Sequence, residues 1–218
     1  MKRWFLVLAL VISLSLGGIA WAEDKKPQGL MLPDGVSKYG DTIYMRIDSM
    51  DFKDTRNIFL ALQEWNWKTV KIDLLSSGGS LFGAMGMVSI FRELQAQGKI
   101  VEIKAQGIVA SAAVLVFLAG TPGHRFIDKY AMLMLHELWT FKFFAIETPS
   151  DKEEEARIFR KIQDKINHYI CEHSKISKEE LNQKTQKKEL WLDAEEAVKY
   201  GLADKIWGES KAVPVATK

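Results

Sequence analysis

Two adjacent glycines constrain the fold of this chain more than any other feature of its sequence. Gly78 and Gly79 lie between residues 69–75, which are typical of a strand, and residues 81–97, which have the apolar spacing of a helix. Glycines allow the backbone to turn sharply and to approach a ligand closely. No Gly-Lys-Ser/Thr sequence follows, so this is not a phosphate-binding loop, and the dinucleotide fingerprint spacing is absent as well. The pair is consistent with a tight turn, or with a turn that binds an oxyanion.

Strands and helices alternate along most of the chain. Further strands are predicted at 42–48, 100–105, 123–127 and 132–135, with a turn at 107–110. Helices are predicted at 54–65, 111–120, 151–173, 178–182 and 193–201. This order predicts an α/β fold with a mainly parallel sheet and right-handed crossover connections.

The N-terminus has the pattern of a signal peptide over residues 1–22. A charged start is followed by an apolar run, and Ala20-Trp21-Ala22 forms a small-x-small cleavage site. We expect cleavage before Glu23 and an exported mature chain, periplasmic or extracellular. The alternative is an uncleaved membrane anchor, although the run is shorter than the ~20 residues that span a bilayer. We expect a flexible arm at 23–40, one domain at 41–209 and a loose tail at 210–218.

The charge of the chain is nearly balanced. Its 218 residues carry a formal net charge of +2, and loss of Lys2 and Arg3 with the leader would remove that excess. Nucleic-acid binding needs a concentrated basic face, so the composition argues against it. Cys171 is the only cysteine, which excludes an internal disulfide and favours a buried structural role for this side chain.

Ser111 is the candidate nucleophile. It follows a turn and opens an apolar helix, where its hydroxyl would be exposed at the positive end of the helix dipole. The N–H of Ala112 lies in the first helical turn and can bind an oxyanion, and the N–H of Gly79 is the candidate second donor. The structural alternative is that Ser111 only caps a buried helix.

His136 is the candidate base, because it stands just past the end of a predicted strand. A histidine there can also be a satisfied structural residue. A zinc-protease helix is excluded, since position 140 is Thr where a second histidine is needed. The other histidines, His124, His168 and His173, have no comparable context.

Four segments in the right order resemble the Clp protease family of the Clp-protease/crotonase superfamily. The resemblance covers about 41–207 and rests on four motifs. They are Leu-Ser-Ser-Gly-Gly between a strand and a helix at 75–79, Gly-Ile-Val-Ala-Ser-Ala at 107–112, Met-Leu-His at 134–136 and Ala-Glu-Glu-Ala-Val-Lys-Tyr-Gly-Leu-Ala-Asp at 194–204. It implies a ββα superhelix with a mainly parallel sheet. It also implies that the long helix 151–173 is the handle with which the family builds rings.

The resemblance implies a role for each site residue. Ser111 would be the nucleophile and His136 the base. Gly79 and Ala112 would form the oxyanion hole, and Gly78 would lie against the substrate. The family's acid is an Asp, and the matching position here is Glu189. Asp193 is closer to the C-terminal motif, but with Glu196 it forms a capping box, so we prefer Glu189 as the acid.

The sequence differs from the family pattern at further positions. Ser77 replaces a proline before the glycines, and Glu137-Leu138 replaces Gln-Pro after the histidine. The altered acid and the change at Glu137-Leu138 keep a non-catalytic scaffold of the same fold, acting in the periplasm, open as an alternative. A crotonase-like acyl-CoA enzyme and a Ser-Lys peptidase, in which a lysine replaces His136 as the base, are further alternatives.

The predicted function is therefore that of a serine endopeptidase that cleaves peptides or unfolded proteins. The resemblance implies a homo-oligomeric ring and no cofactor or metal. The family normally works with an ATP-driven unfoldase. We expect no ATPase partner here, because an exported protein has no ATP supply.

Overall fold

The computed structural model describes residues 36–51, 66–138 and 148–208, together with Thr55, Ile58, Leu62 and Gln63. All of these belong to one compact unit that spans 32–218. The predicted leader and tail, the arm as far as residue 35, and most of the predicted helix 54–65 lie outside the described residues. Among the described helices, none combines the length and the hydropathy that a membrane span needs.

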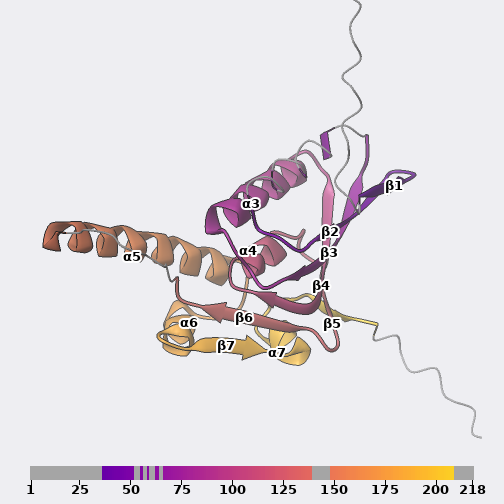
Figure 1. Cartoon of the computed structure of the whole chain (residues 1–218). Helices are drawn as coiled ribbons and strands as arrows, with labels where there is room; N and C mark the ends of the chain where they lie inside the picture. The colour runs from indigo at the N-terminus through magenta and orange to yellow at the C-terminus, as the bar shows by residue number, and fades with distance from the viewer. Residues whose placement is uncertain are drawn as a thin grey trace, which may run out of the picture. The chain divides into compact units, whose positions relative to one another are not determined.

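A mainly parallel sheet forms the centre of the described fold, as the alternation of strands and helices predicts (Figure 1). Six of its strands follow the order β1-β2-β3-β4-β5-β8. Their bounds are Ser37–Tyr39, Thr42–Ile47, Thr69–Ser76, Ile100–Ala110, Arg125–Asp128 and Lys205–Trp207. β1 runs antiparallel to β2, and the other pairs in this order are parallel.

The sheet divides at β4 into two branches. The first half of β4 pairs with β5 through Ile103–Ala105, and its last residues, Ile108–Ala110, pair with β6 (Met132–His136). β6 in turn pairs antiparallel with β7 (Glu189–Leu192). Gly107 lies between the two halves; its φ is +56°, and an added Cβ there would lie 2.7 Å from Leu75 Cδ1. The second branch carries the candidate base and acid.

The hydrophobic core lies between the sheet and two helices, α3 (Leu81–Ala96) and α4 (Ala112–Leu118). All seven residues of α4 are buried, which explains why this segment is apolar on every side. α3 buries one face through Ala84, Met87 and Phe91. α3 follows β3 after the Gly78-Gly79 turn and α4 follows β4 after Ser111, so both N-termini lie at the carboxyl edge of the sheet, where α/β enzymes place their sites.

The remaining helices are α5 (Pro149–Glu172), α6 (Lys178–Thr185) and α7 (Ala194–Lys199). The described side chains of α5 from Ser150 to Ile166 are exposed or only partly buried, and its buried residues lie in the last two turns. The predicted long helix is therefore confirmed, and only its C-terminal end is anchored in the core. There Tyr169 donates a hydrogen bond of 3.2 Å to the carbonyl of Leu115 in α4.

The structure corrects several predicted boundaries. Residues 107–110, predicted as a turn, continue strand β4, because β6 supplies hydrogen-bond partners on its free edge. Ser37–Tyr39, assigned to the flexible arm, forms β1 by pairing with β2. β7 and β8 were not predicted, since each has only three or four residues.

Candidate active site

Ser111 lies at the junction of β4 and α4 in a conformation that is rare for any residue but glycine. Its φ is +55° and its ψ is −127°. Its backbone N–H donates to the carbonyl of Met134 at 2.8 Å, which ties the junction to β6. The Ser111 side chain makes no capping hydrogen bond to α4. The geometry therefore argues against the interpretation that this serine only caps a helix.

The parallel pairing of β4 with β6 brings Ser111 next to His136. Ala110 is in register with Met134, so the ends of the two strands lie side by side. Nε2 of His136 lies 2.8 Å from Oγ of Ser111, which is hydrogen-bond distance. Both side chains are partly buried. This arrangement allows the imidazole to take the hydroxyl proton as a general base.

Gly78 and Gly79 turn the chain directly against Ser111. Their φ angles are +105° and +134°. A Cβ added at Gly78 would lie 2.8 Å from the Cβ of Ser111 and 2.9 Å from the carbonyl oxygen of Ala110. Only glycine fits at this position without displacing the serine. Gly78 therefore places the backbone of this turn beside the candidate nucleophile, whereas a Cβ added at Gly79 would lie 3.5 Å from the Cβ of Met50.

Ala112 is the first residue of α4, directly after Ser111. The first N–H groups of a helix have no acceptor within the helix, so the Ala112 N–H is suited to bind developing negative charge near Ser111. The side chain of Ala112 is 7% exposed, and the adjacent Ala110 is 2% exposed. The alanines on both sides of Ser111 are therefore packed against the core, while Ser111 itself is partly exposed.

Glu189 is brought opposite His136 by the antiparallel pairing of β6 with β7. The two residues are direct register partners, so their side chains share one face of the sheet. Glu189 is exposed, and its Oε2 accepts a hydrogen bond of 2.9 Å from Nε1 of Trp191. Asp193, the alternative acid, caps α7 in a complete capping box with Glu196, as its sequence context predicts.

Two further contacts involve β7 or the turn before it, and the sequence alone indicates neither; the first lies within β7 itself. One is the Trp191–Glu189 hydrogen bond. In the other, Oε2 of Glu137 accepts from the backbone N–H of Lys187 at 3.1 Å. Lys187 has a φ of +55° in the turn that precedes β7. Glu137, which directly follows the candidate base, is thus bonded to the turn that leads to the candidate acid.

A chain of amide side chains fixes the segment after His136 against α5 and α6. The N–H of Leu138 donates to Oε1 of Gln163 at 2.7 Å. Gln163 Nε2 donates to Oδ1 of Asn167, and Asn167 Nδ2 donates to Oδ1 of Asn182. Asn167 is 5% exposed, so these bonds satisfy a buried polar side chain.

Cys171 is partly buried and packs against the core, rather than being fully enclosed. Burial raises the pKa of its thiol, and the nearby carboxylate of Glu179 adds to the effect. A raised pKa lowers the fraction of reactive thiolate. Among the described residues, no group of three or more His, Cys, Asp or Glu side chains is arranged to hold a metal ion.

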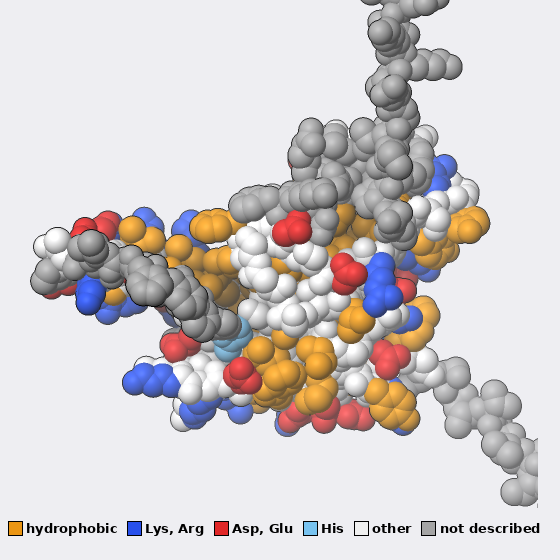
Figure 2. All heavy atoms as spheres, viewed as in Figure 1, with side chains coloured by type: hydrophobic (Ala, Val, Ile, Leu, Met, Phe, Trp, Pro, Cys, Tyr) orange, Lys and Arg blue, Asp and Glu red, His pale blue; other side chains and the backbone are white. Residues whose placement is uncertain are grey.

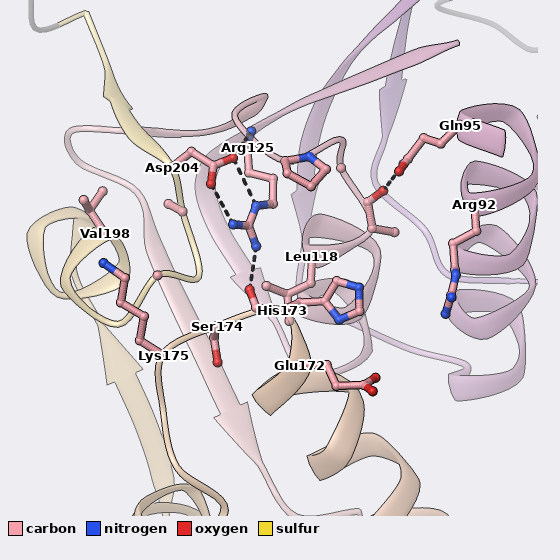
Figure 3. A pocket seen from close by; sticks show the side chains of 15 residues that line it. Arg92, Gln95, Leu118, Arg125, Glu172, His173, Ser174, Lys175, Val198 and Asp204 are labelled. Atoms are coloured by element: carbon pink, nitrogen blue, oxygen red, sulfur yellow. Dashed lines mark hydrogen bonds and ion pairs between the residues drawn. The ribbon is translucent and has the colours of Figure 1, made fainter. Parts of the chain in front are cut away.

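A separate cavity of about 620 Å³ lies where α3, the end of α4, β5 and the end of α5 meet (Figure 3). None of Ser111, His136 and Glu189 lines it. Arg125 lines it, and its guanidinium donates to both carboxylate oxygens of Asp204 and to the carbonyl of His173. These bonds occupy the charged groups of Arg125 and Asp204, so we assign this region a structural role.

The sequence of the chain matches known proteins over most of the described fold. A family model described as Clp protease matches residues 42–210. An ATP-dependent Clp protease proteolytic subunit from Porphyromonas gingivalis is 32% identical over 140 residues, which cover 64% of this chain and 60% of that protein. Proteolytic subunit 3 from Synechococcus sp. is 27% identical, with 64% and 66% covered. Proteolytic subunit 2 from Treponema denticola is 30% identical, with 67% and 70% covered. The chain thus matches less than two thirds of the length of the first two relatives.

Proposed function

The chain belongs to the Clp protease family, which is a family of peptidases, and on this basis we propose that it is an active serine endopeptidase. Ser111 is the nucleophile and His136 its general base. The observation that carries the proposal is the 2.8 Å separation of His136 Nε2 and Ser111 Oγ at the carboxyl edge of the sheet. The same separation favours His136 over a lysine as the base, and so weighs against a Ser-Lys mechanism.

The proposed reaction proceeds through an acyl-enzyme. His136 takes the proton of Ser111, and the serine oxygen forms a bond to a peptide carbonyl carbon. The backbone N–H groups of Gly79 and Ala112 bind the resulting oxyanion. The carbon–nitrogen bond then breaks, and His136 passes its proton to the leaving amine. His136 then takes a proton from water, the water oxygen attacks the ester carbonyl carbon, and the bond to the Ser111 oxygen breaks as that oxygen regains a proton. Glu189 holds the imidazole in the required tautomer throughout.

The substrates follow from the site. The partly exposed Ser111 and His136 at the carboxyl edge of the sheet suit an extended backbone, as in peptides and already unfolded chains. We also propose a homo-oligomeric ring without an ATPase partner. The relatives are named as subunits of an ATP-dependent protease, whereas the sequence of this chain predicts export to a compartment without ATP. Size-exclusion chromatography tests the ring, which is excluded if the chain elutes as a monomer at high concentration.

We propose that the mature protein acts outside the cytoplasm after removal of residues 1–22. The support is the sequence pattern of a charged start, an apolar run and a small-x-small site. Expression of the whole chain in a Gram-negative host, followed by intact mass measurement of the periplasmic fraction, tests this. We expect a mature chain that begins at Glu23. Recovery of the uncut chain from the membrane fraction would contradict it.

Kinetics of two variants test the catalytic assignment. Ser111→Ala and His136→Ala should each lower kcat for an internally quenched peptide by at least about 10³-fold, because nucleophile and base act as a unit. The double variant should be no worse than either single variant for the same reason. Peptidase activity that survives in Ser111→Ala would refute the assignment.

One observation keeps a non-catalytic scaffold as the second candidate. The carboxylate of Glu189 accepts a hydrogen bond from Trp191 and is exposed to solvent. If this bond holds the carboxylate away from His136, Glu189 does not serve as the acid of a Ser-His-acid site. Peptide binding without any hydrolysis by the wild-type protein would favour the scaffold.

A further inference from the structure

A row of hydrophobic side chains extends from His136 along one face of β6. The strand alternates strictly: Leu133 and Leu135 are buried, while Met132, Met134 and His136 point to the opposite face. The candidate base therefore stands at the end of a short apolar row. Two methionines in this row are partly exposed, although a solvent-facing strand face is normally polar.

The neighbouring strands widen this row. Ile108 of β4 is in register with Met132, and Trp191 of β7 is in register with Met134. Register partners in adjacent strands share a face, so these side chains lie side by side. Ile108 is 46% exposed, Met132 38% and Trp191 41%. We call these four residues the apolar strip, and Figure 2 shows hydrophobic side chains gathered over β6 and β7 beside a histidine.

We propose that the apolar strip is an accessory binding site for an extended apolar segment of the polypeptide substrate, several residues away from the scissile bond. The proposal rests on the peptidase function proposed above. Its basis is that the strip shares a face with His136 and begins next to it, so a chain whose carbonyl lies at Ser111 can run over it. Contiguous exposed apolar surface next to a site marks binding.

Strand geometry sets the distance between the strip and the reacting bond. Met132 precedes His136 by four residues of β6. At about 3.3 Å per residue, its Cα lies roughly 13 Å from that of His136. A substrate in an extended conformation spans that distance with about four residues. The strip therefore selects an apolar residue about four positions from the scissile bond.

The substrate contacts the strip through side chains rather than through backbone pairing. Over the strip, β6 is already paired with β4 on one edge and with β7 on the other. A second copy of the chain is a poorer occupant, because four partly exposed side chains offer on the order of 300 Å², whereas a standard interface buries about 800 Å² on each partner.

Hydrolysis of matched peptides tests the proposal. The substrates are two matched pairs of internally quenched peptides. Within each pair, the peptides differ only in carrying Leu or Ser four positions from the scissile bond. That position is on the N-terminal side of the bond in one pair and on the C-terminal side in the other. We expect wild-type protein to prefer the Leu peptide by about tenfold in kcat/KM for one of the two directions. In the double variant Ile108→Thr, Met132→Thr, this ratio of kcat/KM should fall close to one. The change should come from a higher KM for the Leu peptide.

Tyr39→Thr is the matched control. It removes an aromatic side chain that is 71% exposed on β1, an edge strand outside the branch that carries the strip, and it should keep the tenfold ratio. Equal cleavage of both peptides by wild-type protein overturns the proposal, and so does an unchanged ratio in the double variant. If the double variant changes its oligomeric state and loses kcat/KM equally for both peptides, the strip is a contact between copies of the chain. That result also overturns the proposal.

Binding separates this proposal from the peptidase function. Fluorescence anisotropy of the labelled peptides with Ser111→Ala measures their affinities without turnover. A preference for the Leu peptide that is lost on adding Ile108→Thr and Met132→Thr supports the strip, even if the wild-type protein hydrolyses nothing and the proposed function fails. Equal affinities for the two peptides overturn the strip while leaving the proposed function intact.

Discussion

At the scale of single residues, the site depends on backbone conformations that few residues adopt. Ser111 has a φ of +55°, which costs a residue with a side chain of the order of 1–3 kcal/mol. Such strain persists only where the surroundings enforce it, and here the N–H of Ser111 is held by Met134 while Gly78 packs against its Cβ. The backbone strain at Ser111 lowers the stability of the fold, and it holds this one hydroxyl at the site.

Gly78→Ala should disable the site. The new methyl group would lie 2.8 Å from Ser111 Cβ and would require a left-handed conformation from alanine. A displacement of the nucleophile by about 1 Å lowers kcat/KM by roughly 10²-fold. Gly40→Ala is the control: its φ is also positive, but a Cβ there meets nothing within 4 Å, so only the strain remains. Comparable peptidase activity in the two variants would contradict the proposed packing.

Glu189→Gln tests the acid. If Glu189 fixes the tautomer of His136, the amide should lower kcat by about 10³–10⁴-fold without changing the fold. Trp191→Phe, which removes the N–H that holds Glu189 Oε2 but keeps a ring, should lower kcat by about tenfold and alter the pH profile. Activity of Glu189→Gln within twofold of wild type would show that another group, or none, orients the imidazole.

At the scale of elements, the site is assembled from the ends of strands that are distant in sequence. Ser111 directly follows β4, His136 ends β6, and Glu189 begins β7. β6 and β7 have few residues, so their positions depend on contacts outside the sheet. The amide chain from Leu138 through Gln163 and Asn167 is one such contact.

Asn167→Ala should destabilise the fold by about 1–3 kcal/mol, because it breaks two side-chain hydrogen bonds at a buried position. Lys165→Ala on the same helix is exposed and should change the free energy of unfolding by less than about 0.5 kcal/mol. Urea unfolding of both variants measures the difference. Equal stability of the two variants would show that the amide chain contributes nothing.

The elements also show which features could be predicted from the sequence and why the others could not. The alternation of strands and helices is local information, and it predicts the parallel sheet and the helices that pack on it. The motifs around Gly78, Ser111 and His136 are local too, and the structure places these three residues together. The roles of Trp191 and Glu137 depend on the register of β6 with β7, which is set by long-range pairing.

At the scale of the whole molecule, one ion pair joins segments from distant parts of the chain. Arg125 of β5 binds Asp204, which precedes β8, and also the carbonyl at the end of α5 (Figure 3). Burial alone would raise the pKa of Asp204, but the hydrogen bonds and charge of Arg125 outweigh it and lower that pKa. The two side chains are only 11% and 18% exposed. This pair therefore stabilises the fold in a pH-dependent way.

Asp204→Asn should lower the free energy of unfolding by about 3 kcal/mol at pH 7, because it leaves a largely buried guanidinium without its charge partner. A carboxyl whose pKa is depressed on folding contributes its stability above the unfolded value of about 4, and the contribution is lost as the pH falls through the folded value. The difference between wild type and variant should therefore shrink between pH 4 and pH 2. A difference that stays constant over this range would contradict the role of the pair.

The central claim, that Ser111 is a nucleophile activated by His136, is tested most directly by mass spectrometry after treatment with a fluorophosphonate. The reagent forms a bond only with an activated hydroxyl. We predict one adduct per chain, located on Ser111 by fragmentation, and none in His136→Ala. Unmodified Ser111 in the folded wild-type protein, or equal labelling in His136→Ala, would contradict the account.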